Sequence, residues 1–147
     1  SDPARVGCLV ETAHSILAGL DPSDDMAYAL AHKKLKSVHL NDQGGLKFDQ
    51  DKTFGSHNLR RAFNQIRVLD EYGYGKNGEW IGLDVKAMRK QKQAGNTKHL
   101  PTSKERFMFL LENARTLNKK LEAQLIAQRD YEELDRYIVC HLMGVKY

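Results

Sequence analysis

The chain of 147 residues is long enough for one domain with its own hydrophobic core. Its 41% hydrophobic and 29% charged residues are typical of a globular protein in water, and no stretch approaches the ~20 consecutive apolar residues of a transmembrane helix, which excludes a membrane partner. The net charge of +4 is spread along the chain beside acids rather than clustered, which argues against nucleic acid as a partner.

The first half of the chain alternates between predicted strands and helices. Arg5–Glu11 is a short apolar run of the kind that forms a strand buried on both faces. A helix follows from Ser23, which we expect to be its N-cap, to about Lys34. The second strand is Lys36–Asn41, and a glycine-containing loop follows over 42–55.

The pattern continues with a helix from His57 to about Tyr72, which Ser56 is expected to cap. The third strand is Glu79–Asp84, and a polar loop follows over 86–101. One long amphipathic helix is predicted over 102–128 and a last helix over 130–142.

Strands that alternate with helices of this length predict an α/β fold with a parallel sheet. Three parallel strands cannot cover themselves, and an eight-stranded barrel takes about 250 residues. We therefore expect the C-terminal part of a (β/α)₈ TIM barrel, with the missing N-terminal barrel portion as a partner. Residues 1–101 would be its last three βα units, and 102–147 terminal helices that serve packing or an oligomer interface.

Side chains able to bind metal stand at or just beyond the end of each predicted strand. In an α/β barrel the carboxyl ends of the strands converge on one face, where active sites form. Singly, such an aspartate is usually a turn former or helix cap, and such a histidine a hydrogen-bonded core residue. Together they favour a metal site, formed by Glu11, His14, His39, Asp49, Asp51 and Asp84, with Asn41 beside them.

Several carboxylates in one place repel one another unless a cation neutralises them. Asp49 and Asp51 are two residues apart and would point the same way in an extended chain. Oxygen ligands with one or two imidazoles suit Mg²⁺, Mn²⁺ or Co²⁺, whereas Zn²⁺ more often brings cysteine or further histidine. We therefore expect one or two divalent ions, Mn²⁺ or Mg²⁺ first.

Over residues 5–90 the sequence resembles the xylose isomerase-like barrel superfamily, particularly its sugar isomerases. Glu11-Thr12-Ala13-His14 is similar to the family's E-x-x-H, Asp49-Gln50-Asp51 to its D-x-D, and the stretch 82–86 to its G-x-D-x-K. The resemblance implies that Glu11 bridges two metals and that His14, Asp49 and Asp51 bind the catalytic one. Asp84 would bind the structural metal.

His39 departs from the pattern of xylose isomerases proper, which have aspartate there, and is similar to the histidine ligand of L-rhamnose isomerases. Glu11, His39 and Asp84 would then form most of the structural site. Abasic-site endonucleases are an alternative, because they share the barrel and have a sequence segment very similar to residues 38–42. Their later motif, however, is D-x-H, and their last ligand is Glu. A non-catalytic barrel fragment is a third reading.

The resemblance implies an aldose–ketose isomerase that shifts hydride between C1 and C2 of a sugar substrate. His14, Asp49 and Asp51 would be the catalytic residues, with Asn41 and Lys86 supporting the ligands. A further glutamate ligand and a lysine on earlier strands of the family are not in these residues, so the chain alone is not expected to catalyse. The resemblance also implies a homo-oligomer. Free Cys8 and Cys140 favour a cytoplasmic protein.

Overall fold

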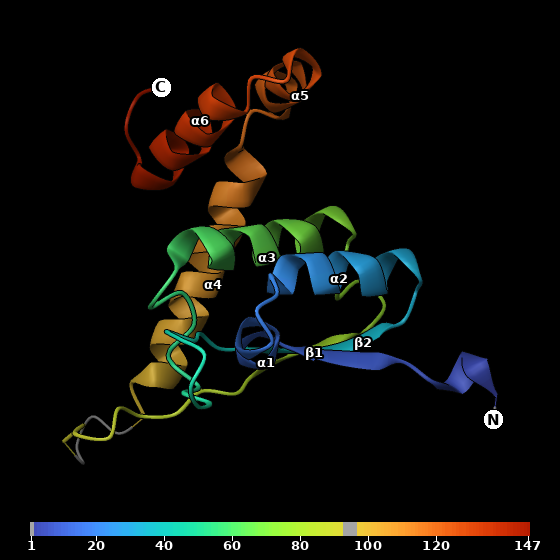
Figure 1. The fold of residues 1–147 in the computed structure, drawn as a ribbon, viewed down its shortest axis with the longest axis vertical. Helices are drawn as coiled ribbons and strands as arrows, with labels where there is room; N and C mark the ends of the chain where they lie inside the picture. The colour runs from blue at the N-terminus through green and yellow to red at the C-terminus, as the bar shows by residue number, and fades with distance from the viewer. Residues whose placement is uncertain (1, 93–96) are drawn as a thin grey trace.

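A computed structural model describes residues 2–92 and 97–147 as a mixed α/β structure (Figure 1). No helix in these ranges is both long and apolar enough to cross a bilayer. The elements in chain order are η1 (Pro3–Arg5), β1 (Cys8–Glu11), α1 (Thr12–Leu17), α2 (Pro22–Ala31), β2 (Leu35–Leu40), α3 (Leu59–Glu71), β3 (Trp80–Leu83), α4 (His99–Thr116), α5 (Lys119–Gln128) and α6 (Tyr131–Met143).

The three strands form one parallel sheet, as the sequence predicts, and their order in it is β1-β2-β3. Paired residues form rows across the sheet, and two neighbouring rows matter for the site. Val10 pairs with Val38 in one row, and Glu11 pairs with His39 in the next. His39 pairs in turn with Gly82 on β3, so the second row crosses the sheet near its carboxyl edge. This arrangement is consistent with part of a TIM barrel.

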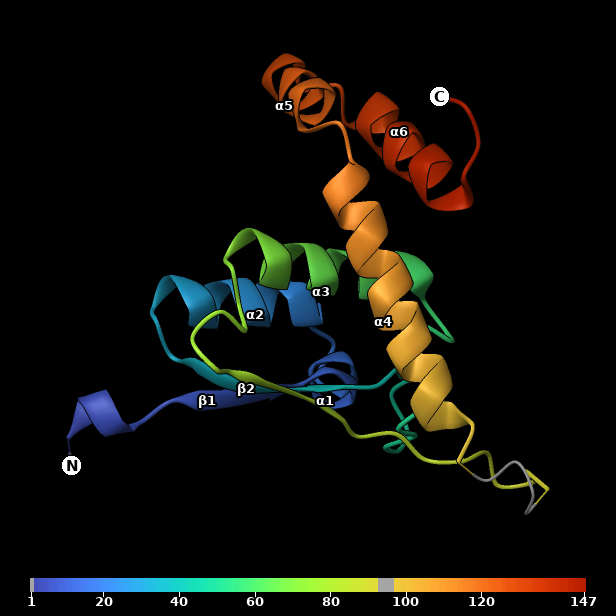
Figure 2. The same ribbon diagram turned by 180° about the vertical axis from the view of Figure 1, so that it is seen from behind.

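Among residues 2–92 and 97–147, helices cover one face of the sheet. In both views α2 and α3 lie on the same side of the strands (Figures 1 and 2). Val38 on β2 and Phe63 on α3 are fully buried in the core between the sheet and these helices. Because side chains alternate along a strand, Leu9 and Trp80 point to the opposite face, where they are 48% and 79% exposed. In the described residues this face has no helix over it.

The C-terminal helices extend the core beyond the sheet. α4 packs against α3, and Leu110 on α4 is fully buried in the shared core. Farther along, Arg67 on α3 contacts Glu122 on α5 at 2.5 Å, and Arg60 contacts Asp135 on α6 at 3.1 Å. α4 crosses beside α3 and leads to α5 and α6 (Figure 2).

Both predicted N-caps were wrong by two residues. Asp21, not Ser23, caps α2 by accepting a hydrogen bond from the Ser23 amide, because Pro22 occupies the first helical position with its φ already helical. Asn58, not Ser56, caps α3. The buried Asp42 carboxylate binds the amide of residue 57 at 2.7 Å and so holds the chain before Asn58 outside the helix.

Three further features of the helices differ from the sequence-based prediction. The segment after β1 forms a helix, α1, which the sequence pattern did not indicate. The predicted helix over 102–128 is two helices, because Leu117 is extended (φ −61°, ψ 134°) and Asn118 starts α5 by accepting a hydrogen bond from the Leu121 amide. α4 begins at His99 rather than at residue 102, since Pro101 is tolerated in the first turn of a helix.

Candidate metal centre

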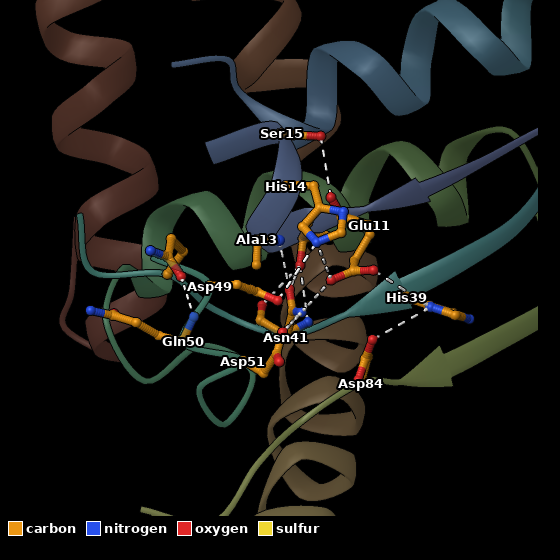
Figure 3. A network of polar contacts seen from close by, with 12 residues as sticks. Glu11, Ala13, His14, Ser15, His39, Asn41, Asp49, Gln50, Asp51 and Asp84 are labelled. Atoms are coloured by element: carbon orange, nitrogen blue, oxygen red, sulfur yellow. Dashed lines mark hydrogen bonds and ion pairs between the residues drawn. The ribbon is translucent and has the colours of Figure 1, made fainter. Parts of the chain in front are cut away.

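Two groups of side chains that could hold a metal ion lie at the carboxyl edge of the sheet, and they share Glu11 (Figure 3). Within each group the potential ligand atoms all lie within 4.8 Å of one another. Glu11 is the last residue of β1, and its side chain is 11% exposed. The two groups contain five of the six ligands that the sequence predicts.

The first group is Glu11, His39 and Asp84. His39 comes from β2, and Asp84 follows directly after β3. The His39 Nδ1 lies 3.9 Å from Glu11 Oε2 and 3.9 Å from Asp84 Oδ2. The three strands therefore each contribute one side chain, as expected where parallel strands end at a common edge.

The second group is Glu11, His14 and Asp49. His14 lies one turn into α1, and its Nε2 is 3.3 Å from Glu11 Oε1 and 3.6 Å from Asp49 Oδ2. The helical turn brings residues 11 and 14 to the same side. Sequence spacing alone predicted this convergence, although it did not predict the helix that produces it.

The carboxylates in this centre are poorly compensated. Burial raises the pKa of Glu11, and the negative charges of Asp84 and Asp49 add to the rise, while His14 and Asn41 partly oppose it. Burial also raises the pKa of Asp49, helped by the neighbouring Asp51. Such shifts mean that ionised carboxylates are disfavoured here without a cation. The donor set of carboxylates with one imidazole per group fits a divalent ion such as Mn²⁺, Co²⁺ or Mg²⁺.

Asn41 connects the start of α1 with the loop that carries Asp49 and Asp51. Its side chain is buried, and its Oδ1 accepts a hydrogen bond of 2.6 Å from the Ala13 amide at the start of α1. Its Nδ2 donates to Glu11 Oε1 at 3.3 Å and to Asp51 Oδ1 at 3.0 Å. Asn41 thus orients the carboxylate that both groups share (Figure 3).

The structure places Asp51 differently from the other predicted ligands. Its side chain is only 2% exposed and forms an ion pair with Lys86, and it belongs to neither group. The backbone of Asp51 has φ +42°, so the prediction that Asp49 and Asp51 share an extended segment was wrong. The Lys86 amide also donates to the Asp51 carbonyl at 2.7 Å, which attaches the segment after β3 to this loop. Contact with Asp51 raises the pKa of the Lys86 ammonium.

Three positioning residues were not among the predicted site residues. The Thr12 hydroxyl accepts a hydrogen bond of 2.9 Å from the Asn41 amide and is fully buried. Gln43, also buried, donates to the carbonyls of Gly45 and Phe48 at 2.6 and 2.8 Å and so folds the loop before Asp49. The third, Asp42, binds the chain ahead of α3. A run of polar residues directly after an apolar strand is the only signal that could have indicated them.

Comparisons with known proteins bear on this centre. No model of a known protein family matches the chain. It is 44% identical over 72 residues to xylose isomerase from Thermus thermophilus, which covers 49% of this chain and 19% of that protein. It is 31% identical over 131 residues to xylose isomerase from Thermus caldophilus, a match that covers 89% of this chain and 33% of that protein. It is 40% identical over 72 residues to xylose isomerase from Streptomyces lividans, which covers 49% of this chain and 18% of that protein.

The matched segments span from 18% to 33% of the length of these curated relatives. The longest match includes 89% of the chain, so the likeness is not confined to one short motif. The identities agree with the resemblance carried by the E-x-x-H and D-x-D motifs. The chain belongs to the xylose isomerase-like family.

Proposed function

We propose that this chain supplies part of the metal centre of an aldose–ketose sugar isomerase. The observation that carries the proposal is the position of Glu11, whose carboxylate belongs to both groups of potential ligands. One carboxylate between two sets of donors is the arrangement expected for two neighbouring divalent ions. Ions bound there would polarise the carbonyl of an open-chain sugar as Lewis acids while hydride shifts between C1 and C2.

The chain's own residues would have distinct tasks. Glu11, His39 and Asp84 would hold one ion, and Glu11, His14 and Asp49 the other. Asp51 lies beside Asp49 and is paired with Lys86. The Asp51 carboxylate and the Lys86 ammonium would hold or pass the proton that moves between the two sugar oxygens. Asn41 would keep Glu11 and Asp51 in place.

The remaining part of the barrel would have to come from outside these residues. The relatives are three to five times longer than the matched segments, and one face of the sheet bears exposed Leu9 and Trp80. We propose that further βα units, on the same or another polypeptide, cover this face and supply the further glutamate and lysine. A homo-oligomer built through the terminal helices and a cytoplasmic location remain part of this proposal.

The test uses the purified protein, metal-stripped with EDTA and then supplied with Mn²⁺ or Mg²⁺. Added ion should raise the melting temperature, since a ligand that binds only the folded state stabilises it. Glu11→Gln should abolish the increase because both groups lose a ligand, whereas Glu105→Gln on the exposed side of α4 should keep it. No shift with any divalent ion in the unsubstituted protein would refute the metal centre.

Activity separates the two enzyme classes that share this barrel. We call this chain together with the further βα units the complete protein. With Mn²⁺, the complete protein should convert an aldopentose or deoxyhexose into its ketose and leave DNA intact. The abasic-site endonuclease alternative predicts nicking of DNA that contains an abasic site and no sugar turnover. The identities to xylose isomerases support the first outcome.

A further inference from the structure

The imidazole of His39 packs against a glycine on the neighbouring strand. His39 and Gly82 are cross-strand partners in the register of β2 and β3. A Cβ at position 82 would lie 2.8 Å from His39 Cδ2 and 3.3 Å from Nε2, closer than packed side chains tolerate. Gly82 is not among the residues with positive φ, so its backbone does not require glycine. The missing side chain therefore makes room for the ring.

This packing determines which ring nitrogen faces the carboxylates. The Cδ2–Nε2 edge lies over Gly82, and Nδ1 lies on the side of Glu11 and Asp84. Both distances from Nδ1 are 3.9 Å, longer than a hydrogen bond. Donor atoms around one ion, each about 2.1 Å from it, are separated by about 3–4 Å. The spacing suits an ion between the three side chains better than direct hydrogen bonds among them.

An imidazole donor changes which ions a site prefers. Mg²⁺ takes oxygen ligands almost exclusively and gives up its waters reluctantly, whereas transition-metal ions gain from nitrogen donors in the order Mn²⁺, Fe²⁺, Co²⁺. A carboxylate at position 39 would give an all-oxygen group with Glu11 and Asp84. His39 replaces one of those three donors with nitrogen.

We propose that the His39–Gly82 pair makes the Glu11–His39–Asp84 group a nitrogen–oxygen site that binds through His39 Nδ1 and selects Co²⁺ over Mg²⁺. The proposal rests on the proposed metal centre and adds its ion preference. The preference is a property of binding, so it can be measured without any sugar turnover.

The first measurement compares Co²⁺ and Mg²⁺ affinities by calorimetric titration. All proteins would carry His14→Ala, which removes one donor from the second group and leaves the His39 group to be observed. We expect Co²⁺ to bind at least tenfold more tightly than Mg²⁺. His39→Asp should reduce that ratio at least tenfold, and Gly82→Ala should do the same by displacing the ring. The matched control is His32→Asp at the exposed end of α2, which should leave the ratio unchanged.

The second measurement identifies the ligand atom. Histidine side-chain ¹⁵N spectra with diamagnetic Zn²⁺ should show a shift at the Nδ1 of one ring, and the signal should disappear in His39→Asp. Coordination through Nε2, or equal Co²⁺/Mg²⁺ ratios in the parent and His39→Asp, would overturn the proposal while leaving the metal centre intact. If the parent protein binds neither ion, both the preference and the metal centre fall together.

Discussion

The side-chain amide of Asn41 donates a hydrogen bond of 3.0 Å to the buried carboxylate of Asp51. Asp51 follows Asn41 by ten positions in sequence, and the same amide also reaches Glu11 at 3.3 Å. A single nitrogen therefore aligns the carboxylate shared by both ligand groups with the carboxylate that pairs with Lys86.

Replacement of Asn41 should damage both folding and ion binding. Asn41→Ala leaves the Ala13 amide without its acceptor and the Asp51 carboxylate without one of its donors, and loss of partners for buried polar groups costs about 1–3 kcal/mol of the free energy of unfolding. Metal affinity should fall roughly 10–100-fold, as for other residues that orient ligands.

Asn41→Asp separates the two effects. An aspartate keeps the acceptor for Ala13 but removes the donor and adds a third carboxylate beside Glu11 and Asp51. Calorimetric titration with Mn²⁺ should show a larger loss of metal affinity for Asn41→Asp than for Asn41→Ala. Denaturant unfolding measures the stability of both variants. Equal metal affinity in Asn41→Asp and the parent protein would mean that Asn41 does not orient Glu11.

Asp49→Asn tests whether this loop carboxylate serves the ion. The Asp49 side chain contacts His14 at 3.6 Å from a loop that is otherwise held by Gln43. We expect the complete protein to lose more than the roughly 10–100-fold in kcat that follows loss of a supporting residue. Its melting temperature in EDTA should hardly change.

The matched control for Asp49→Asn is Asp24→Asn on the exposed face of α2, which should change neither kcat nor the melting temperature in EDTA. Steady-state kinetics and thermal melts of the two variants give the comparison. A variant at position 49 that unfolds more easily yet retains its kcat would identify Asp49 as a structural loop residue.

The turn before β3 should have a measurable pH dependence. The pKa of Glu79 is lowered from 4.5, first by its own backbone amide, then by Asn77 and by the amide of Gly75. Because the folded pKa lies below the unfolded one, the stabilisation is fully present above the unfolded value. It is lost as pH falls through the folded value.

As the pH falls from about 6 to 3, the melting temperature should therefore decline more steeply for the parent protein than for Glu79→Gln. Glu105→Gln, which leaves this turn intact, should follow the parent curve. Parallel curves for Glu79→Gln and the parent would show that the Glu79 hydrogen bonds do not persist in solution.

The uncovered face of the sheet should drive association. Trp80 is the only tryptophan of the chain, so its emission reports directly on this face. Its emission should move to shorter wavelength as protein concentration rises, together with an increase in molar mass by light scattering. Leu9→Lys on the same face should weaken association at least about tenfold, since burial of one leucine contributes ~1.5–3 kcal/mol.

Tyr28→Lys provides the control for Leu9→Lys, because Tyr28 is 72% exposed on α2, away from the sheet's open face. It should associate like the parent chain. A monodisperse monomer with red-shifted Trp80 emission and a turnover of about 1–10³ s⁻¹ would show that the chain neither needs a partner on this face nor lacks essential residues.

The sequence by itself determined the three parallel strands and the positions of the candidate ligands at their ends. Strands in this fold are short apolar runs, which are local features, and polar residues follow directly where each run leaves the core. Because parallel strands end at one edge, the position of Glu11, His39 and Asp84 at strand ends was enough to predict that they converge.

Only the tertiary structure decided how those residues divide. Asp51 pairs with Lys86 and stays outside both groups, and its backbone takes a left-handed conformation that no local pattern indicates. The orientation of Glu11 depends on Asn41, thirty residues later. The orientation of His39 depends on Gly82 of another strand. Contacts between residues so far apart in sequence form only after the sheet has assembled, which is why the three folded strands, and not their separate sequences, define the two ligand groups.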